Sequence, residues 1–169
     1  MSESEIPFVK RHNEQVSAAK KKAEAELQKR VQNGEKVKAD GLPVWERFVA
    51  RLCKFARELE KMEDANLSGS ASPSDDGAER SCFVQVRCDA PVLPALSLVL
   101  RYKPGDHRIR WVCEGRPMND IELVVGGFRD TEIRLRFDKR GALSPEDVAD
   151  QLIEWMIPRA KEHGIEYVG

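Results

Sequence analysis

Apolar and polar residues alternate with a period of two in five short segments of this chain, at residues 82–88, 95–102, 108–113, 120–126 and 131–137. Such alternation is typical of β-strands that bury one face, and half-solvated strands of this kind occur mostly in antiparallel sheets. Short links join the segments, among them Lys103–Asp106, which fits a type II turn with Pro104 and Gly105 at its centre. None of the links has room for a crossover helix, so we expect a five-stranded antiparallel meander in an α+β fold.

The alternation also assigns a buried face to the predicted sheet. Its apolar residues are Cys82, Val84, Val86, Cys88, Leu96, Leu98, Leu100, Tyr102, Ile109, Trp111, Cys113, Ile121, Leu123, Val125, Ile133, Leu135 and Phe137. Two prolines in Asp89–Pro94 remove backbone donors, so that segment is expected to be a loop or an irregular edge. Gly126 and Gly127 begin a second hairpin link.

Two segments show the three-and-four spacing of an amphipathic helix. In residues 44–62 the apolar positions are Trp45, Phe48, Leu52, Phe55, Leu59 and Met62. In residues 145–157 they are Val148, Leu152, Trp155 and Met156, with Ile153 at the margin. Ser144 is expected to cap the second helix, and Pro158 to kink or end it.

Both amphipathic helices need an apolar partner, and one face of the sheet offers it. A helix is about 10 Å across, so two helices fit side by side on five strands. The sequence therefore predicts a two-layer domain with both helices on one face of the sheet. Its core is expected to contain Trp45, Phe48, Leu52, Phe55, Trp111, Leu123, Leu135, Leu152 and Trp155.

The N-terminal region differs from the rest, because residues 9–31 are highly charged but rich in good helix formers. Their apolar stripe is thin: Val16, Ala19, Ala23, Leu27 and Val31. Such a helix is an exposed arm, pairs with a second helix in an oligomer or a coiled coil, or docks on its own domain. Asn33 and Gly34 are expected to end it, and residues 35–41 to form a polar linker.

These features divide the chain into a polar helical arm at residues 1–40 and an α+β domain at residues 41–169. Within that domain, residues 66–80 contain Ser, Gly, Pro and Asp with almost nothing apolar. This composition predicts a flexible linker.

Composition narrows the class of protein. The 169 residues carry a formal net charge of −1, with 41% hydrophobic and 34% charged residues. A net charge this close to zero argues against non-specific electrostatic binding to nucleic acid or to a membrane surface. No apolar run is long enough to span a bilayer and the first residues lack a secretion signal, so we expect a cytoplasmic protein that does not bind membranes.

The chain shows no signature of a metal or cofactor site. Its four cysteines form no CxxC pair and its three histidines lie far from any zinc-type spacing, so no metal and no cofactor are predicted. The cysteines are expected to be buried thiols, although a bridge between Cys88 and Cys113 is sterically conceivable. Gly126 and Gly127 lie between strands rather than before a helix, and no nucleophile–base pair or acid dyad is recognisable.

One surface suggests a function. If the alternation holds, the outer face of the sheet presents an apolar strip rimmed by arginines, and arginine is enriched at interfaces. The candidate partner-binding residues are Phe83, Arg87, Val99, Arg101, Arg110, Val112, Val124, Arg134 and Arg136. The simpler interpretation is that valine suits strands and arginine gives solubility.

Three function classes follow. The first, which we favour, is an interaction or adaptor module that binds a protein partner or a second copy of itself. The second is a nucleic-acid-binding domain that uses the arginine face, although Phe83 is the only aromatic residue expected to point outward from the strands. The third is an enzyme or small-ligand-binding protein whose site is assembled from residues distant in the sequence.

Overall fold

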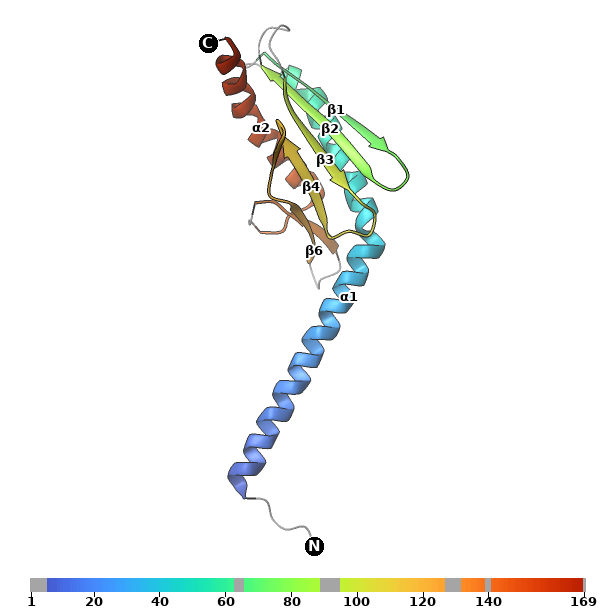
Figure 1. Cartoon of the computed structure of the whole chain (residues 1–169), viewed down its shortest axis with the longest axis vertical. Helices are drawn as coiled ribbons and strands as arrows, with labels where there is room; N and C mark the ends of the chain where they lie inside the picture. The colour runs from blue at the N-terminus through green and yellow to red at the C-terminus, as the bar shows by residue number, and fades with distance from the viewer. Residues whose placement is uncertain (1–5, 63–65, 89–94, 127–131, 139–140, 169) are drawn as a thin grey trace. The chain divides into compact units, whose positions relative to one another are not determined.

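The computed structural model describes residues 6–62, 66–88, 95–126, 132–138 and 141–168. The chain forms two compact units, Met1–Glu35 and Lys36–Gly169. Helix α1 runs from Pro7 to Glu58 and so belongs to both units, and the short 3-10 helix η1, Leu59–Lys61, follows it. The rest of the second unit contains a sheet and helix α2, Pro145–Val168. In Figure 1 the second part of α1 and α2 lie on the same side of the sheet, which gives the expected two-layer α+β arrangement.

The sheet is an antiparallel meander. Its strands are β1 (Leu67–Asp75), β2 (Arg80–Cys88), β3 (Leu96–Tyr102), β4 (Arg108–Cys113), β5 (Arg116–Pro117), β6 (Ile121–Gly126) and β7 (Glu132–Arg136). Their order is β1-β2-β3-β4-β6-β7, and β5 pairs with β4. The predicted count of five strands was therefore too low by β1 and β5, while the meander is confirmed.

Strand β1 corrects the prediction of a flexible linker at residues 66–80. All nine of its residues pair with β2, from Leu67 opposite Cys88 to Asp75 opposite Arg80. Only Leu67 is buried, so the segment lacks the apolar alternation that marks a strand in sequence. Its stability comes from the backbone ladder instead. Asp75 and Asp76 accept hydrogen bonds from the turn that leads into β2, at 2.7 Å from Gly77 N and 2.7 Å from Glu79 N.

The free edge of β1 is partly covered from the helix side. The thiol of Cys53 on α1 donates to the carbonyl oxygen of Ala71 at 3.5 Å. That oxygen points away from β2, and in an antiparallel ladder the backbone groups of alternate residues share one side. Pro73 therefore turns its nitrogen away from β2 as well, which explains why the ladder tolerates a proline at this edge position.

The predicted buried face of the sheet is confirmed in all five of its strands. Inward residues such as Val84, Leu100, Ile109 and Leu135 are completely buried. The turn at Lys103–Asp106 is confirmed too, because Gly105 has φ of 93° and Asp106 N donates to Lys103 O at 2.9 Å. The links predicted at Asp89–Pro94 and after Gly126 lie outside the described residues.

Several apolar positions in the helices differ from the prediction, among them Phe55, which is half-buried rather than buried. Met62 is 47% exposed, because α1 ends at Glu58 and the helical spacing that predicted its burial no longer applies. On α2, Ile153 is fully buried whereas Trp155 is only half-buried. Trp155 contacts the core through one edge, with its ring centroid 5.2 Å from that of Trp111 and an interplanar angle of 82°.

Helix α1 continues through Gly34, which was expected to end it, and through Gly41, which was expected to lie in a linker. Neither Gly34 nor Gly41 has a positive φ, and residues 35–41, predicted as a linker, are helical. Gly41 has a packing role instead, because a Cβ built on it would stand 2.4 Å from the hydroxyl oxygen of Tyr102. The absence of a side chain lets the helix approach the sheet at this point.

Helix α2 begins as predicted and ends later than predicted. The Ser144 hydroxyl accepts a hydrogen bond from Asp147 N at 3.2 Å, which confirms the N-cap. Pro158 lies within the helix and does not end it. It removes one backbone donor, but the guanidinium of Arg159 donates to Trp155 O at 2.8 Å and stacks 3.9 Å from the Trp155 ring centroid. These contacts support the turn around the proline.

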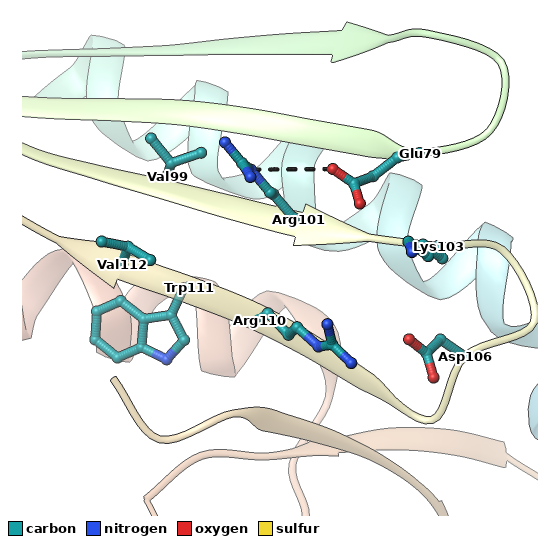
Figure 2. Close-up of a pocket in the computed structure, with 8 residues that line it drawn as sticks. All are labelled: Glu79, Val99, Arg101, Lys103, Asp106, Arg110, Trp111 and Val112. Carbon is teal, nitrogen blue, oxygen red and sulfur yellow. Dashed lines mark ion pairs between the residues drawn. The ribbon is translucent and has the colours of Figure 1, made fainter. Parts of the chain in front are cut away.

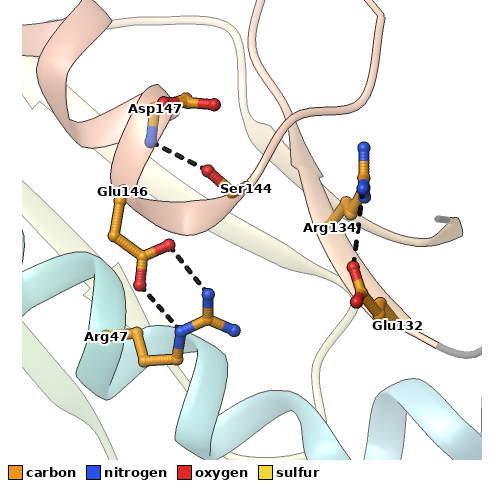
Figure 3. A network of polar contacts seen from close by, with 6 residues as sticks. All are labelled: Arg47, Glu132, Arg134, Ser144, Glu146 and Asp147. Atoms are coloured by element: carbon orange, nitrogen blue, oxygen red, sulfur yellow. Dashed lines mark hydrogen bonds and ion pairs between the residues drawn. The ribbon is translucent and has the colours of Figure 1, made fainter.

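Two bidentate ion pairs join α1 to α2. Arg47 donates to both carboxylate oxygens of Glu146 at 2.8 Å, as Figure 3 shows. One helical turn further on, Arg51 donates to Asp150 at 2.7 and 2.9 Å. The hydrogen bonds from Arg47 lower the pKa of Glu146, and burial opposes that shift only in part.

We expect the pair of Arg47 and Glu146 to make stability depend on pH. Because the folded pKa of Glu146 is lowered, the pair adds stability above the ordinary glutamate pKa of about 4.3, and this stability is lost as the pH falls through the folded pKa. Both side chains are more than a third exposed, so the gain is about 0.5–1 kcal/mol. Urea unfolding of Glu146→Gln should show that loss at neutral pH and no difference from wild type in strong acid. Glu154→Gln, on the exposed side of α2, is the control and should change neither.

Candidate partner-binding surface

The outward side chains of the sheet form rows that cross the strands, because their registers are fixed by pairing. Phe83 lies opposite Val99, Val99 opposite Val112, and Val112 opposite Pro117. We call these four residues the apolar row. Phe83 is 39% exposed, and the two valines are half-buried. An apolar band that is open to solvent on its outer side thus crosses β2, β3, β4 and β5.

Beside the apolar row, two arginines lie directly opposite each other. Arg101 on β3 pairs in register with Arg110 on β4, and both side chains are exposed. Like charges at directly opposite positions of a sheet are destabilising. We call these two residues the arginine pair. Figure 2 shows the pair with Val99 and Val112 beside it on the same two strands.

The arginine pair and the two valines of the apolar row line a hollow of about 200 Å³ on the outer sheet face. Its further lining residues are Glu79, Lys103, Asp106 and Trp111. The sequence did not identify these four, since Glu79 and Asp106 lie in links between strands and Trp111 has its ring in the core. The strand register brings them to the hollow, and no local pattern in the sequence signals it.

Charge at the hollow is only partly neutralised. Three cationic side chains face two carboxylates in its lining. Arg101 Nε lies 3.9 Å from a carboxylate oxygen of Glu79, at the outer limit of an ion pair. Within the described part of the chain, Arg110 and Lys103 make no hydrogen bond or ion pair through their side chains. The hollow therefore offers unpaired positive charge next to apolar surface.

The remaining candidate residues do not join the hollow. Arg87 is half-buried on β2 opposite Ser68, and its Nε has no hydrogen-bond partner among the described residues. On β7, Arg134 and Arg136 each have an acidic neighbour at 3.5 Å, Glu132 and Glu122 respectively. Val124 lines a separate hollow with His107, Arg108 and Asp120. Of the nine candidates, only Val99, Arg101, Arg110 and Val112 therefore line the hollow, and Arg87 is the one remaining arginine among them that has no ion pair with a described residue.

A second, wider groove lies between α1 and β1. It measures about 380 Å³ and is lined mainly by Trp45, Val49, Ala50, Cys53 and Pro73. Three charged residues also line it: Asp75 and Arg80 form an ion pair with each other, and Glu46 makes no ion pair with a described residue. The groove thus provides apolar surface with a single unpaired carboxylate.

Reactive chemistry is not prominent in the described residues. Burial raises the pKa of Cys82 to about 12 and also raises the pKa values of Cys53 and Cys113, so these thiols are poor nucleophiles. Cys113 carries a free thiol, and the conceivable bridge to Cys88 is not formed. No group of three or more potential ligands in the described chain is arranged to hold a metal ion.

In the described part of the chain, no helix has both the length and the apolar character needed to cross a bilayer.

Comparisons of the whole chain with protein-family models, with curated proteins and with solved structures gave no match.

Proposed function

We propose that this protein is an interaction module whose outer sheet face binds a protein partner through acidic and apolar side chains. The observation that carries the proposal is the arginine pair beside the open apolar row. Folding gains nothing from placing Arg101 opposite Arg110, since the two charges repel. Local rules of this kind are broken mainly where function requires it.

The chemistry of the surface favours a protein over a nucleic acid. An acidic side chain of a partner would form charge-assisted hydrogen bonds with Arg110, and its apolar neighbours would cover Phe83 and the valines. A nucleic acid would also meet Glu79 and Asp106, which repel phosphate. Single strands bind to sheets by stacking on several aromatic residues, whereas Phe83 is the only outward aromatic residue on the described strands.

The substitution Arg110→Glu should weaken partner binding while it leaves the fold intact or slightly more stable. The new carboxylate would lie opposite Arg101 and replace a repulsive pair by an attractive one, which is worth up to about 1 kcal/mol. The same change would repel an acidic partner, and we expect about tenfold weaker binding or more. A residue with only a structural role would not show opposite effects on stability and binding.

A displayed library of random peptides, selected on the full-length protein, provides the binding probe. We expect enriched peptides to combine Asp or Glu with large apolar residues, and their synthetic versions to bind wild type and not Arg110→Glu. Lys54→Glu, an equal charge change on the exposed side of α1, is the matched control and should bind normally. Selection of basic peptides, equal binding by Arg110→Glu, or tighter binding to an oligothymidine strand would contradict the proposal.

A further inference from the structure

The first unit of the chain carries most of the exposed large hydrophobic side chains. Six of the eight such residues in the described chain lie between Ile6 and Val31. Phe8 is 71% exposed and Leu27 is 61% exposed, although both lie on a well-formed helix. Every described residue from Ile6 to Gln32 is exposed, so this half of α1 gains no stability from burial. Helices of this kind are usually stabilised by a partner.

The apolar stripe of this region has a small residue at its centre, with the small Ala19 on one side of it and the large Leu27 on the other. Val16, Ala19, Ala23, Leu27 and Val31 follow one another at spacings of three or four. A twofold axis through Ala23 exchanges position 23 − n with position 23 + n. Ala19 of one copy then comes level with Leu27 of a second copy, so a small side chain meets a large one. Arg30 comes level with Val16, which its aliphatic stem can cover.

The charges around Ala23 show the same twofold pattern. Lys20 and Lys22 precede it, and Glu24 and Glu26 follow it. At 100° per residue, Lys20 and Glu24 flank one side of the stripe while Lys22 and Glu26 flank the other. In an antiparallel pair of helices like flanks face each other, so Lys20 of one copy faces Glu24 of the other, and Lys22 faces Glu26. A parallel pair in register would place lysine at the level of lysine.

These four charged residues remain available for a partner. Among the described residues, none of the four makes a hydrogen bond or ion pair through its side chain. Their spacing within one helix is i,i+4 with lysine first, which is the weaker order for an intrahelical pair.

We infer that residues Val16–Val31 bind a second copy of this chain in an antiparallel helix pair centred on Ala23. The paired segment extends over about 22 Å at 1.5 Å per residue. Its seam is made of the apolar stripe, and ion pairs between lysine and glutamate flank the centre of the seam on both sides. The inference is independent of the outer sheet face, because it uses only residues of the first unit.

Charge reversal tests the pairing. Sedimentation of the full-length protein should show a concentration-dependent dimer. The double variant Lys20→Glu with Lys22→Glu should raise the dissociation constant of the dimer by about tenfold or more. Glu24→Lys with Glu26→Lys should do the same, because each double change makes all facing pairs repulsive. An equimolar mixture of the two double variants, and the variant with all four changes, should dimerise again. The double change Lys54→Glu and Lys61→Glu, elsewhere on the surface, should leave the dimer unchanged.

Oxidative cross-linking tests the direction of the helices. Ala23→Cys should form a disulfide between two copies, because the two Ala23 positions meet at the axis. Leu27→Cys should not, since the two thiols would be about 12 Å apart along the helices. A monomer at all concentrations, a dimer that ignores the charge reversals, or efficient cross-linking by Leu27→Cys would overturn the inference. Circular dichroism should confirm the helix in each variant.

Discussion

Replacing Trp111 by alanine should remove about 3–5 kcal/mol from the free energy of unfolding, the usual cost of deleting a buried tryptophan. Trp111 is 4% exposed on β4, and it contacts Phe137 and Trp155 with ring centroids at 6.0 and 5.2 Å. Its indole N–H also donates to Asn119 O at 2.7 Å and so holds the link before β6. A domain is typically stable by only about 5–15 kcal/mol, so the loss should lower the midpoint of thermal unfolding by roughly 10 °C.

Two further variants make this expectation specific. Trp111→Phe keeps much of the contact with α2 and should lose clearly less stability than the alanine variant. Trp155→Ala should also lose less, since Trp155 is half-buried and its outer face is covered by Arg159. Urea unfolding followed by far-ultraviolet circular dichroism avoids the loss of the fluorescent probe. If Trp155→Ala lost more free energy of unfolding than Trp111→Ala, Trp111 would not be the more important core residue, and the expectation would be wrong.

Gly41→Ala should destabilise the protein by about 1–2 kcal/mol, although alanine is the better helix former. The new Cβ would lie 2.4 Å from the hydroxyl oxygen of Tyr102 and 3.2 Å from a methyl carbon of Leu123. Forcing a methyl group into a packed interface costs about 1–3 kcal/mol, which exceeds the gain of about 1 kcal/mol in helix propensity. The same substitution at Gly34, where a Cβ would meet no atom within 4 Å, should not be destabilising.

Tyr102→Phe should reverse the effect of Gly41→Ala. The Tyr102 hydroxyl is buried without a well-formed hydrogen bond to a described residue. Burial raises its pKa, and the nearby N–H of Gly105 lowers it only in part. Its removal should therefore cost little and should open space for the methyl group that Gly41→Ala introduces. We expect a coupling energy of about 2 kcal/mol in a double-mutant cycle measured by urea unfolding. Additive losses in the double variant would show that the hydroxyl is not the obstacle.

The sequence predicted those parts of the fold that depend on side-chain burial. Period-two alternation identified the inner face from Cys82 to Phe137, because a strand with one solvated face must alternate. Alternation did not identify strand β1, because backbone pairing with β2 stabilises this strand and its side chains stay mostly exposed. The linker predicted at residues 35–41 was wrong for a related reason. The segment is helical, and Gly41 in it allows the close approach of Tyr102, which lies far away in the sequence.

The candidate surface could be predicted only in part. Alternation placed Phe83, Val99 and the arginines on the outer face, and their exposure agrees with that placement. Which of them meet depends on the strand register, and period-two alternation restricts that register only to shifts by an even number of residues. The direct opposition of Arg101 and Arg110 therefore became visible only with the paired strands. The ion pair between Arg136 and Glu122 on the neighbouring strand depends on register in the same way, whereas Glu132 lies two residues from Arg134 on the same strand.

The construction of β1 has a consequence for colloidal behaviour. An outermost strand ordinarily invites a neighbouring molecule to extend the sheet, and repeated extension produces fibrils. Pro73 offers no proton on the open side, and the Cys53 thiol already occupies the Ala71 carbonyl. A strand added at this edge would lack a hydrogen bond at Pro73 and would have to displace the thiol at Ala71. Concentrated solutions of the protein should therefore resist aggregation by this route.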